Sequence, residues 1–321
     1  MLFGQLGMLY DVIIVGAGPT GLTAGIFARA RELSTLILEA RQGGGQLTVL
    51  YPTKSVYDYP SYIAIEAEEL GRLFVEHARL SGCELHEGEE VTELKKKGKH
   101  WRVGTTKGYH EGRAVILAMG IGLFEPKRLD VPGEDDFDGK GVFYGVKDRR
   151  EFKQKRVVVV GGGDSALETA LQIVAHAAEV YLVHRREQFR AMEKNVDAVA
   201  RSNIKVLLSS EVAQITGDSE LRSVVVYNNM TLVKRTIDVD AIIVQVGFET
   251  KPGWRGKWGL ELEGDRLIKV SADMSTSLPG VFACGDIVFY PSKEKRIVTG
   301  CGEAVTAISS AYRFVKSPYW A

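Results

Sequence analysis

The sequence predicts an α/β protein of two domains, because one pattern of strand, glycine-rich turn, helix and strand occurs twice along its 321 residues. The first copy starts at residue 10 and the second at residue 156. An apolar fraction of 45% is enough for two hydrophobic cores of ordinary size. We therefore expect two three-layer domains, each built on a parallel sheet, with the second domain inserted into the first.

The first copy begins with an apolar, β-branched run at residues 10–15, which is typical of a buried parallel strand. A glycine-rich turn from Gly16 to Gly21 follows directly, and an alanine-rich helix is expected over residues 22–31. A second strand at residues 34–38 ends on Glu39. This spacing indicates a Rossmann-like βαβ unit.

In this first turn, Gly16 permits the tight bend, Gly18 lets a pyrophosphate approach the backbone, and Gly21 allows helix and strand to pack closely. The pyrophosphate would lie on the helix N-terminus, where free N–H groups and the macrodipole favour negative charge. Glu39 can accept both ribose hydroxyls but would repel a 2′-phosphate, so the site suits FAD or NAD. A plain strand-to-helix turn is the alternative, and the acid in register argues against it. The candidate residues are Gly16, Gly18, Pro19, Thr20, Gly21 and Glu39.

The second copy differs from the first at the end of its second strand. Its strand, turn, helix and second strand are expected at residues 157–160, 161–166, 167–175 and 179–183. A basic cluster follows in place of an acid, and guanidinium groups match phosphate oxygens in bidentate geometry. This pattern favours the 2′-phosphate of NADPH, and the alternative is a solvated basic turn that binds no phosphate. The candidate residues are Gly161, Gly163, Asp164, Ser165, His184, Arg185, Arg186 and Arg190.

Two apolar segments with similar endings mark the places where the chain is expected to cross between the domains. Residues 114–120 and 240–247 each have the pattern of a strand that ends in a small-residue turn. We place the first part of the FAD-binding domain at residues 9–120, the inserted NADPH-binding domain at 121–248, and the second part of the FAD-binding domain at 249–321.

The composition excludes several classes of protein. With 41 basic and 41 acidic side chains the formal net charge is zero, so we expect no nucleic acid and no membrane as a partner. Three cysteines without a CxxC do not make a secreted disulfide framework. Neither a signal peptide nor an apolar run of about 18 residues is found. We therefore expect a cytoplasmic protein.

Five short motifs, in the same order along nearly the whole chain, resemble those of the low-molecular-weight thioredoxin reductases. They are GAGPTG at residues 16–21, GGQL at 44–47, GGGDSA at 161–166, HRREQFR at 184–190 and CGD at 284–286. Thioredoxin reductases carry a CxxC before the second glycine turn, but Tyr144 and Lys147 stand at the two expected cysteine positions. We therefore expect no thiol pair to pass electrons from a flavin to a disulfide substrate.

A sub-branch that lacks the thiol pair, the thioredoxin-reductase-like ferredoxin–NADP⁺ reductases, is more similar. Its members have segments that resemble residues 50–58, 285–287, 290–291 and 300–304. The resemblance implies that FAD and NADPH are the cofactors, that ferredoxin or flavodoxin is the electron acceptor, and that the chain forms a homodimer. It also implies contacts with FAD from Thr20, Glu39, Gln46, Tyr51, Val91, Phe124 and Asp286.

The same resemblance implies how the flavin is held. Asp286 would bind a ribityl hydroxyl, and a helix that opens near Gly302 and Glu303 would direct its N-terminus at the pyrimidine ring. Members of the family usually have a longer C-terminal tail that covers one face of the flavin. Here Tyr319 or Trp320 could stack on the flavin instead, or could only anchor the terminus or a subunit interface.

The chemistry that these cofactors imply is hydride transfer between nicotinamide C4 and flavin N5, which needs no acid or base from the protein, so no catalytic residue is assigned. The favoured function is an FAD-dependent reductase that takes hydride from NADPH and passes electrons to ferredoxin or flavodoxin. One alternative is an NAD(P)H oxidase or a reductase of small disulfides or quinones, and another is a thioredoxin reductase with displaced thiols. A non-catalytic, redox-sensing flavoprotein is the last, but it would have no use for a phosphate-binding arginine cluster.

Three further features have two interpretations each. Cys284 and Cys301 could form a redox pair, but small buried side chains are the simpler interpretation. The lysine-rich residues 95–99 are a partner-binding patch or, as we expect, the tip of a hairpin between strands at 91–94 and 101–103. The basic residues 147–156 are an exposed linker or a docking surface for an acidic electron carrier.

Overall fold

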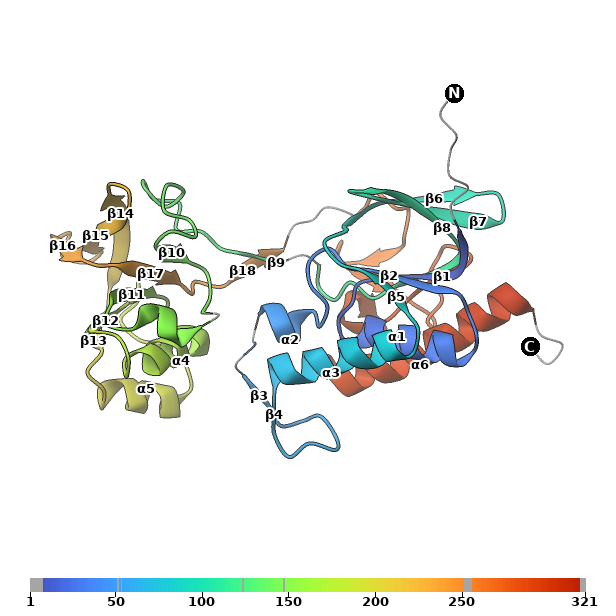
Figure 1. The fold of residues 1–321 in the computed structure, drawn as a ribbon, viewed down its shortest axis with the longest axis horizontal. Helices are drawn as coiled ribbons and strands as arrows, with labels where there is room; N and C mark the ends of the chain where they lie inside the picture. Colours follow the sequence, from blue (N-terminus) through green and yellow to red (C-terminus); the bar gives the residue numbers. More distant parts are fainter. Residues whose placement is uncertain are drawn as a thin grey trace, which may run out of the picture. The chain divides into compact units, whose positions relative to one another are not determined.

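The computed structural model describes residues 8–50, 52, 54–122, 124–146, 148–250 and 256–317. These residues form two compact units (Figure 1). The first unit holds the described residues before Phe124 and after Thr250, and the second runs from Phe124 to Thr250, where the sequence placed residues 121–248. The second unit begins and ends with β9 (Phe124–Pro126) and β18 (Phe248–Thr250), because these two strands pair with each other.

The first unit contains a seven-stranded sheet with the order β5-β2-β1-β8-β7-β6 and with β21 beside β8. The strands are β1 (Leu9–Val15), β2 (Thr35–Leu38), β5 (Glu84–His86), β6 (Val91–Lys97), β7 (His100–Thr105), β8 (Gly108–Leu117) and β21 (Val281–Ala283). The carboxyl ends of four parallel strands are level, since Val15 pairs with Leu38 and Leu117, and Leu117 pairs with Ala283. The loops that follow these strands therefore meet at one edge, which is where ligands bind in such sheets.

Helices cover one face of this sheet (Figure 1). They are α1 (Pro19–Ala30), α3 (Ala67–Leu80), α6 (Ile297–Lys316) and the short α2 (Gln46–Val49). The opposite face packs in a second apolar cluster that contains Trp258 and Ile268. Short elements complete the unit: β3 (Ser55–Val56), β4 (Ile65–Glu66), β19 (Leu262–Glu263), β20 (Leu267–Lys269), β22 (Val288–Phe289) and the 3₁₀ helix η2 (Gly285–Ile287).

The second unit has a five-stranded parallel sheet between two other layers. Its strands, in spatial order, are β10 (Val142–Phe143), β17 (Ala241–Val244), β11 (Arg156–Val160), β12 (Glu179–Val183) and β13 (Lys205–Leu207). One face packs on α4 (Asp164–Ile173) and α5 (Glu193–Ala200). The other packs on the antiparallel β14 (Ser210–Gly217), β15 (Leu221–Asn228) and β16 (Lys234–Asp238). A 3₁₀ helix, η1 (Arg149–Phe152), precedes β11.

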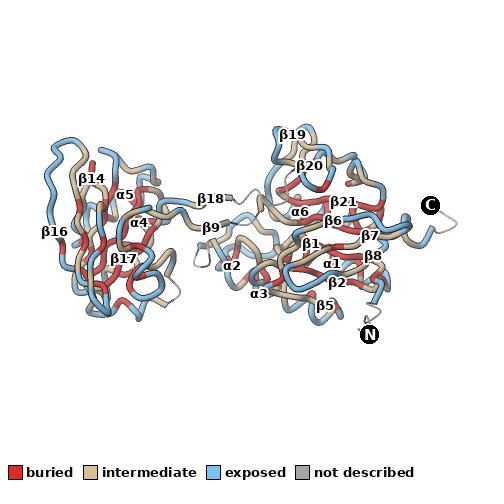
Figure 2. Tube along the Cα trace, turned by 90° about the horizontal axis from the view of Figure 1, so that it is seen from above, coloured by how far each residue is buried: buried red, intermediate tan, exposed pale blue. Residues whose placement is uncertain are grey.

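The predicted α/β class with two Rossmann-like three-layer domains is confirmed. The central strands of the two large sheets, β1, β2, β11 and β17, are buried along most of their length (Figure 2). Both first helices start earlier than expected, α1 at Pro19 and α4 at Asp164, because the last residues of each glycine turn already form the first helical turn. The lysine-rich segment does lie in the hairpin of β6 and β7. Among the described residues, no helix is long and apolar enough to cross a membrane.

Candidate functional site

The first glycine turn is shaped by contacts that only glycine allows. A Cβ added at Gly16 would lie 2.5 Å from the carbonyl oxygen of Ala118, and one added at Gly21 would lie 1.9 Å from the carbonyl oxygen of Gly16. Gly18 is different, because its added Cβ would find only the Cα of Gly45, at 3.9 Å. Backbone atoms thus leave no room for a side chain at Gly16 and Gly21, whereas the space above Gly18 is open. A pyrophosphate that approaches the turn needs such an open space.

A second glycine segment, Gly43 to Gly45, packs against this turn. The N–H of Gly44 donates to the carbonyl oxygen of Ala17 at 2.8 Å, and a Cβ on Gly45 would lie 2.8 Å from the Cα of Gly18. Both Gly44 and Gly45 have positive φ angles, 100° and 61°. We did not predict this segment as part of the site, although three consecutive glycines after Glu39 were a signal for it.

Glu39 lies at the carboxyl end of β2, and backbone N–H groups orient its carboxylate. Oε2 accepts from the N–H of Ala17 at 2.8 Å, and Oε1 accepts from the N–H of Arg41 at 2.9 Å. Burial raises the pKa of Glu39, and these hydrogen bonds act in the opposite direction. Because each carboxylate oxygen has two lone pairs, the group can still accept ribose hydroxyls.

The fold brings three other predicted residues to the same edge of the sheet. Gln46 Nε2 lies 3.4 Å from Asp286 Oδ2, although 240 residues separate them in the chain. Thr20 packs where η2 and α6 begin, because a Cβ on Gly285 would lie 3.0 Å from its Oγ1 and one on Gly300 would lie 2.3 Å from it. The region next to the Gly16–Gly21 turn therefore contains Thr20, Gln46 and Asp286.

A buried ionic group behind Asp286 was not predicted from the sequence. The Glu303 carboxylate accepts from the N–H of Gly285 at 2.7 Å and from the hydroxyl of Tyr290 at 2.6 Å, and it pairs with Lys293. The Lys293 and Glu303 side chains are only 6% and 5% exposed. Burial and then the Glu303 carboxylate raise the pKa of Tyr290 to about 12.

The expectation that a helix opens near Gly302 and Glu303 is wrong. Helix α6 begins at Ile297, so Glu303 lies in its second turn and holds the backbone of η2. Gly300, in the first turn of α6, is required for close contact with Thr20, because an added Cβ would lie 2.3 Å from the Thr20 hydroxyl oxygen.

Some predicted flavin contacts are not placed by the structure. Tyr51, Tyr319 and Trp320 lie outside the described residues, as does Lys147. Phe124 belongs to β9 of the second unit, and its side chain is not described. Val91 starts β6, two residues after Glu89, whose N–H donates to the carbonyl oxygen of Glu39 at 2.8 Å.

Two alanine substitutions test the cradle. Gly18→Ala is expected to leave the unfolding temperature of the flavin-free protein within about 2 °C, because φ is −74° and the added methyl meets nothing closer than 3.9 Å. FAD affinity should fall at least about tenfold, since the methyl enters the open space. Gly21→Ala should destabilise even the flavin-free protein, by about 1–3 kcal/mol, through overpacking.

Thermal unfolding with and without FAD, together with titration of FAD into the flavin-free variants, measures both effects. Unchanged FAD affinity in Gly18→Ala would show that no phosphate lies above Gly18.

The second glycine turn has the same geometry as the first and is also held by hydrogen bonds to Asp164. A Cβ on Gly161 would lie 2.4 Å from the carbonyl oxygen of Gln245, whereas one on Gly163 would meet only the carbonyl oxygen of Arg190, at 3.9 Å. Asp164 is turned toward α5, where its Oδ1 accepts from the N–H of Met192 at 2.8 Å and from Asn195 at 2.7 Å. Ser165 is exposed in the first turn of α4.

The basic residues after β12 separate into two groups. Arg185, Arg186 and Arg190 are exposed, and none of them forms an ion pair with a described residue. His184 is buried: its ring packs on Gly162, stacks on Phe189 at 5.5 Å and contacts the carbonyl oxygen of Gln188 at 3.0 Å. Burial, with the nearby arginines, lowers the pKa of His184. The structure thus gives His184 a supporting position that the sequence did not predict.

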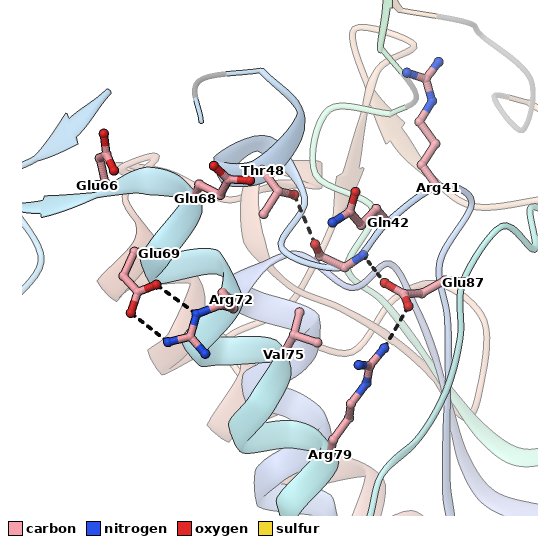
Figure 3. A pocket seen from close by; sticks show the side chains of 11 residues that line it. Arg41, Gln42, Thr48, Glu66, Glu68, Glu69, Arg72, Val75, Arg79 and Glu87 are labelled. Carbon is pink, nitrogen blue, oxygen red and sulfur yellow. Dashed lines mark hydrogen bonds and ion pairs between the residues drawn. The ribbon is translucent and has the colours of Figure 1, made fainter. Parts of the chain in front are cut away.

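A cavity of about 620 Å³ lies beside Gly43 and is distinct from the open face of the turn (Figure 3). Four carboxylates and three guanidinium groups line it, so acidic groups are in excess. Arg79 pairs with Glu87, whose other oxygen accepts from the N–H of Gly43 at 2.7 Å, and Arg72 pairs with Glu69 (Figure 3). Because these acidic groups would repel a phosphate, the cavity does not have the character of a dinucleotide site.

The cysteines have the character expected of small buried side chains. All three are free, and Cys284 is completely buried. Burial raises the pKa values of Cys284 and Cys301, so both favour the neutral thiol.

Two dinucleotide cradles, one ending on an acid and the other on exposed arginines, define a two-nucleotide oxidoreductase. Residues 10–311 match the family described as pyridine nucleotide-disulphide oxidoreductase. The chain is 42% identical to a ferredoxin–NADP reductase of Thermus thermophilus, covering 94% of this chain and 91% of that protein. It is 39% identical to one of Symbiobacterium thermophilum, covering 96% and 93%.

Among solved structures, the thioredoxin reductase of Lactococcus lactis in its FR conformation is 30% identical, with a TM-score of 0.76 over 96% of this chain and 100% of that one. The chain therefore belongs to the pyridine nucleotide-disulphide oxidoreductases and, within them, to the thioredoxin-reductase-like ferredoxin–NADP⁺ reductases. It is an NADPH-dependent flavoprotein oxidoreductase, and its cofactors are FAD and NADPH.

Proposed function

We propose that this enzyme passes electrons from NADPH through FAD to ferredoxin or flavodoxin, without a thiol relay. The observation behind this proposal is the contrast between the two turns. The first ends on the Glu39 carboxylate, and the second ends on three exposed arginines that have no acidic partner among the described residues. A carboxylate suits the ribose hydroxyls of FAD, and guanidinium groups suit the 2′-phosphate of NADPH.

In this proposal the first unit holds FAD. The open space above Gly18 and the N-terminus of α1 receive the pyrophosphate, and Glu39 accepts the adenosine ribose hydroxyls. Gln46 and Asp286 bind the ribityl and flavin end. Gly16, Pro19, Thr20, Gly21, Tyr51, Val91 and Phe124 complete the proposed FAD site.

The second unit holds NADPH in the same manner. Gly163 leaves the space for the pyrophosphate, and Ser165 in the first turn of α4 is free to donate to it. Arg185, Arg186 and Arg190 bind the 2′-phosphate. Gly161, Asp164 and His184 complete the site by shaping and supporting the turn.

The protein's own contribution to the reaction is binding and orientation. When bound, FAD supplies a group that accepts a hydride and releases electrons one at a time. Glu39 and Asp286 fix the two ends of that cofactor, and Glu303 holds the backbone N–H of Gly285 beside Asp286. The arginines align the nicotinamide nucleotide. Because the cofactors carry the hydride transfer, no side chain has to exchange a proton.

The residues before β11 support a direct transfer to the acceptor. Tyr144 stands where the thioredoxin reductases have a cysteine. Its hydroxyl donates to the buried Glu134 at 2.8 Å. Burial, with the Glu134 carboxylate, raises the pKa of Tyr144. A tyrosine in this position is a structural side chain and cannot replace a redox-active thiol.

The basic segment 147–156 is the proposed docking surface for an acidic carrier, but only part of it is available. Arg156 pairs with Asp240 at 2.8 Å, Arg150 pairs with Asp148 at 2.7 Å, and Phe152 is buried. Arg149 and Lys153 are exposed and form no ion pair with a described residue. These two side chains are therefore the ones to test.

Charge reversal at Arg149 and Lys153 is expected to raise the KM for ferredoxin about tenfold at low salt and to flatten its salt dependence, because steering by complementary charge is lost. Flavin reduction by NADPH should be unaffected. Arg201→Glu is the matched control, since Arg201 is an exposed arginine of the same unit. An unchanged salt dependence in the double variant would exclude this surface.

The function is tested by mixing the anaerobic enzyme with NADPH and then adding ferredoxin, flavodoxin or oxidised thioredoxin, while the flavin absorbance is followed. We expect NADPH to bleach the flavin, and ferredoxin or flavodoxin, but not thioredoxin, to restore its colour. Reoxidation by thioredoxin, or by none of the three proteins, would contradict the proposal. Rapid reoxidation by air alone would favour an oxidase.

Assembly and domain motion are inferred from the family resemblance alone, and the location is inferred from the composition. We propose a homodimer in the cytoplasm, in which the second unit turns about the loops after Gly120 and Gly247. Both glycines have positive φ angles, 61° and 101°, that few other residues adopt. A cross-link between the two units should then abolish NADPH oxidation.

A further inference from the structure

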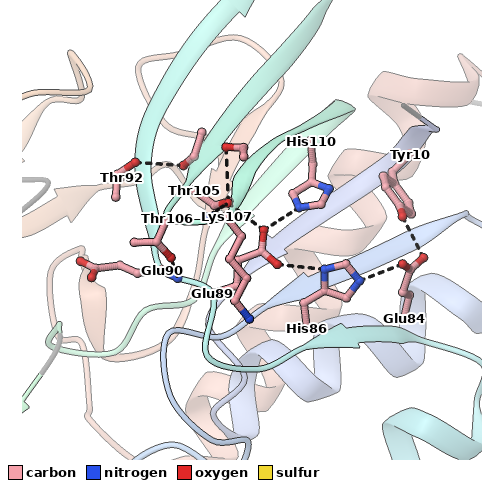
Figure 4. A network of polar contacts seen from close by, with 12 residues as sticks. Tyr10, Glu84, His86, Glu89, Glu90, Thr92, Thr105, Thr106, Lys107 and His110 are labelled. Atoms are coloured by element: carbon pink, nitrogen blue, oxygen red, sulfur yellow. Dashed lines mark hydrogen bonds and ion pairs between the residues drawn. The ribbon is translucent and has the colours of Figure 1, made fainter. Parts of the chain in front are cut away.

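A compact group of imidazole and carboxylate side chains lies in the first unit (Figure 4). It consists of His86 at the end of β5, Glu89 in the loop before β6, and His110 on β8. His86 Nδ1 lies 3.0 Å from Glu89 Oε2, and His110 Nε2 lies 2.8 Å from Glu89 Oε1. The three ligand atoms lie within 4.8 Å of one another.

Two members of this group, His86 and Glu89, are each oriented by a further hydrogen bond on the outer side. His86 Nε2 lies 2.9 Å from Glu84 Oε1, and the other oxygen of Glu84 accepts from the hydroxyl of Tyr10 at 2.8 Å. Glu89 Oε1 accepts from the hydroxyl of Thr105 at 2.7 Å. An imidazole whose far nitrogen is held by a carboxylate is the usual arrangement around a metal-binding histidine.

The proton count of His86 is a second, independent indication of a cation. The ring lies between two carboxylates, and both of its nitrogens are within 3.0 Å of a carboxylate oxygen. A neutral imidazole has one N–H, so one of these contacts would set a lone pair against a carboxylate oxygen. A cation between His86 and Glu89, either a proton or a metal ion, removes that repulsion.

The burial of the group also suits a metal ion. The Glu89 side chain is 5% exposed, whereas His110 and His86 are 21% and 34% exposed, so an ion can enter from the side of the histidines.

We propose that His86, Glu89 and His110 form a binding site for a divalent transition-metal ion, with Zn²⁺ as the best match. Two imidazoles and one carboxylate are a common zinc ligand set, which leaves a fourth position for water. Tetrahedral zinc needs ligand atoms about 3.4 Å apart, so the widest separation in the group, which is within 4.8 Å, has to shorten by up to about 1.4 Å. Side-chain rotation of the partly exposed His86 can supply this movement.

The expected role of the ion is to stabilise the loop behind Glu39. The N–H of Glu39 donates to the carbonyl oxygen of His86 at 2.9 Å, and the N–H of Glu89 donates to that of Glu39 at 2.8 Å. An ion that joins β5, this loop and β8 would therefore stiffen the backbone on which Glu39 is placed. The site itself does not depend on which nucleotide or electron acceptor the enzyme uses.

The test uses the FAD-bound enzyme after treatment with a chelator and gel filtration. Titration with Zn²⁺ should show one ion per chain, and Zn²⁺ at 100 times its dissociation constant should raise the unfolding temperature by roughly 5 °C. Glu89→Gln and His110→Gln should each weaken binding at least tenfold. His100→Gln is the matched control, because His100 pairs with Glu111 on the same hairpin and lies outside the group.

Co²⁺ bound to the unaltered enzyme gives a second measurement that does not depend on folding of the variants. We expect the visible d–d absorption of a four- or five-coordinate Co²⁺ site, and its loss on addition of Zn²⁺. Absence of this band, no Zn²⁺ binding to the wild type, or binding that both variants retain would overturn the proposal. The group would then be a hydrogen-bonded cluster whose cation is a proton.

Discussion

The double variant Arg185→Gln, Arg190→Gln is expected to lose roughly 100-fold or more in kcat/KM for NADPH. Each arginine is exposed beside the turn at Gly163 and forms no ion pair with a described residue, so each is available to a phosphate. A hydrogen bond to a charged group contributes about 1.5–3 kcal/mol, so two of them contribute at least about 3 kcal/mol. Most of the loss should be in KM, because these contacts lie far from the reacting atoms.

Steady-state kinetics with both nucleotides separates phosphate binding from damage to the turn. NADH has no 2′-phosphate, so its kcat/KM should change less than about threefold. Arg201→Gln is the control, since Arg201 is an arginine of the same unit that is 82% exposed on the side chain. Equal losses with NADH and NADPH would show that the arginines only support the fold of the turn.

Lys293→Met is expected to have the largest effect on stability. The substitution leaves the Glu303 carboxylate, 5% exposed, without its cation. Removal of one partner from a buried ion pair costs about 3–5 kcal/mol, because the remaining charge is desolvated and uncompensated. The unfolding temperature should therefore fall by about 10 °C, and FAD should bind more weakly, because Glu303 also holds the N–H of Gly285.

The double variant Lys293→Met, Glu303→Gln tells whether the uncompensated charge is the cause. We expect it to recover a large part of the lost stability, because it removes the buried charge as well as its partner. Arg72→Met is the surface control: Arg72 and Glu69 are 57% and 46% exposed, so the loss should be less than about 1 kcal/mol. A Lys293→Met enzyme that melts within 1 °C of the wild type would contradict this account.

The two glycine turns and the class of fold could be predicted from the sequence, because their physical causes are local. A β-branched run, a glycine turn and a helix lie within about 30 residues of each other, and the acid or the arginines follow at a fixed distance. The absence of a CxxC was equally visible in the sequence. The ends of the second unit depend on the pairing of β9 with β18 across more than a hundred residues, which a local pattern does not show.

The tertiary structure alone decided how the side chains of these segments are used. Packing places His184 under the turn and Asp164 against α5, whereas Arg185, Arg186 and Arg190 are exposed. Residues 86, 110 and 293 have no distinctive pattern around them in the sequence, and nothing there indicates that residue 303 is one half of a buried ion pair. Their partners become visible only when separate strands and helices bring the charges within hydrogen-bond distance, because burial and proximity are properties of the folded chain.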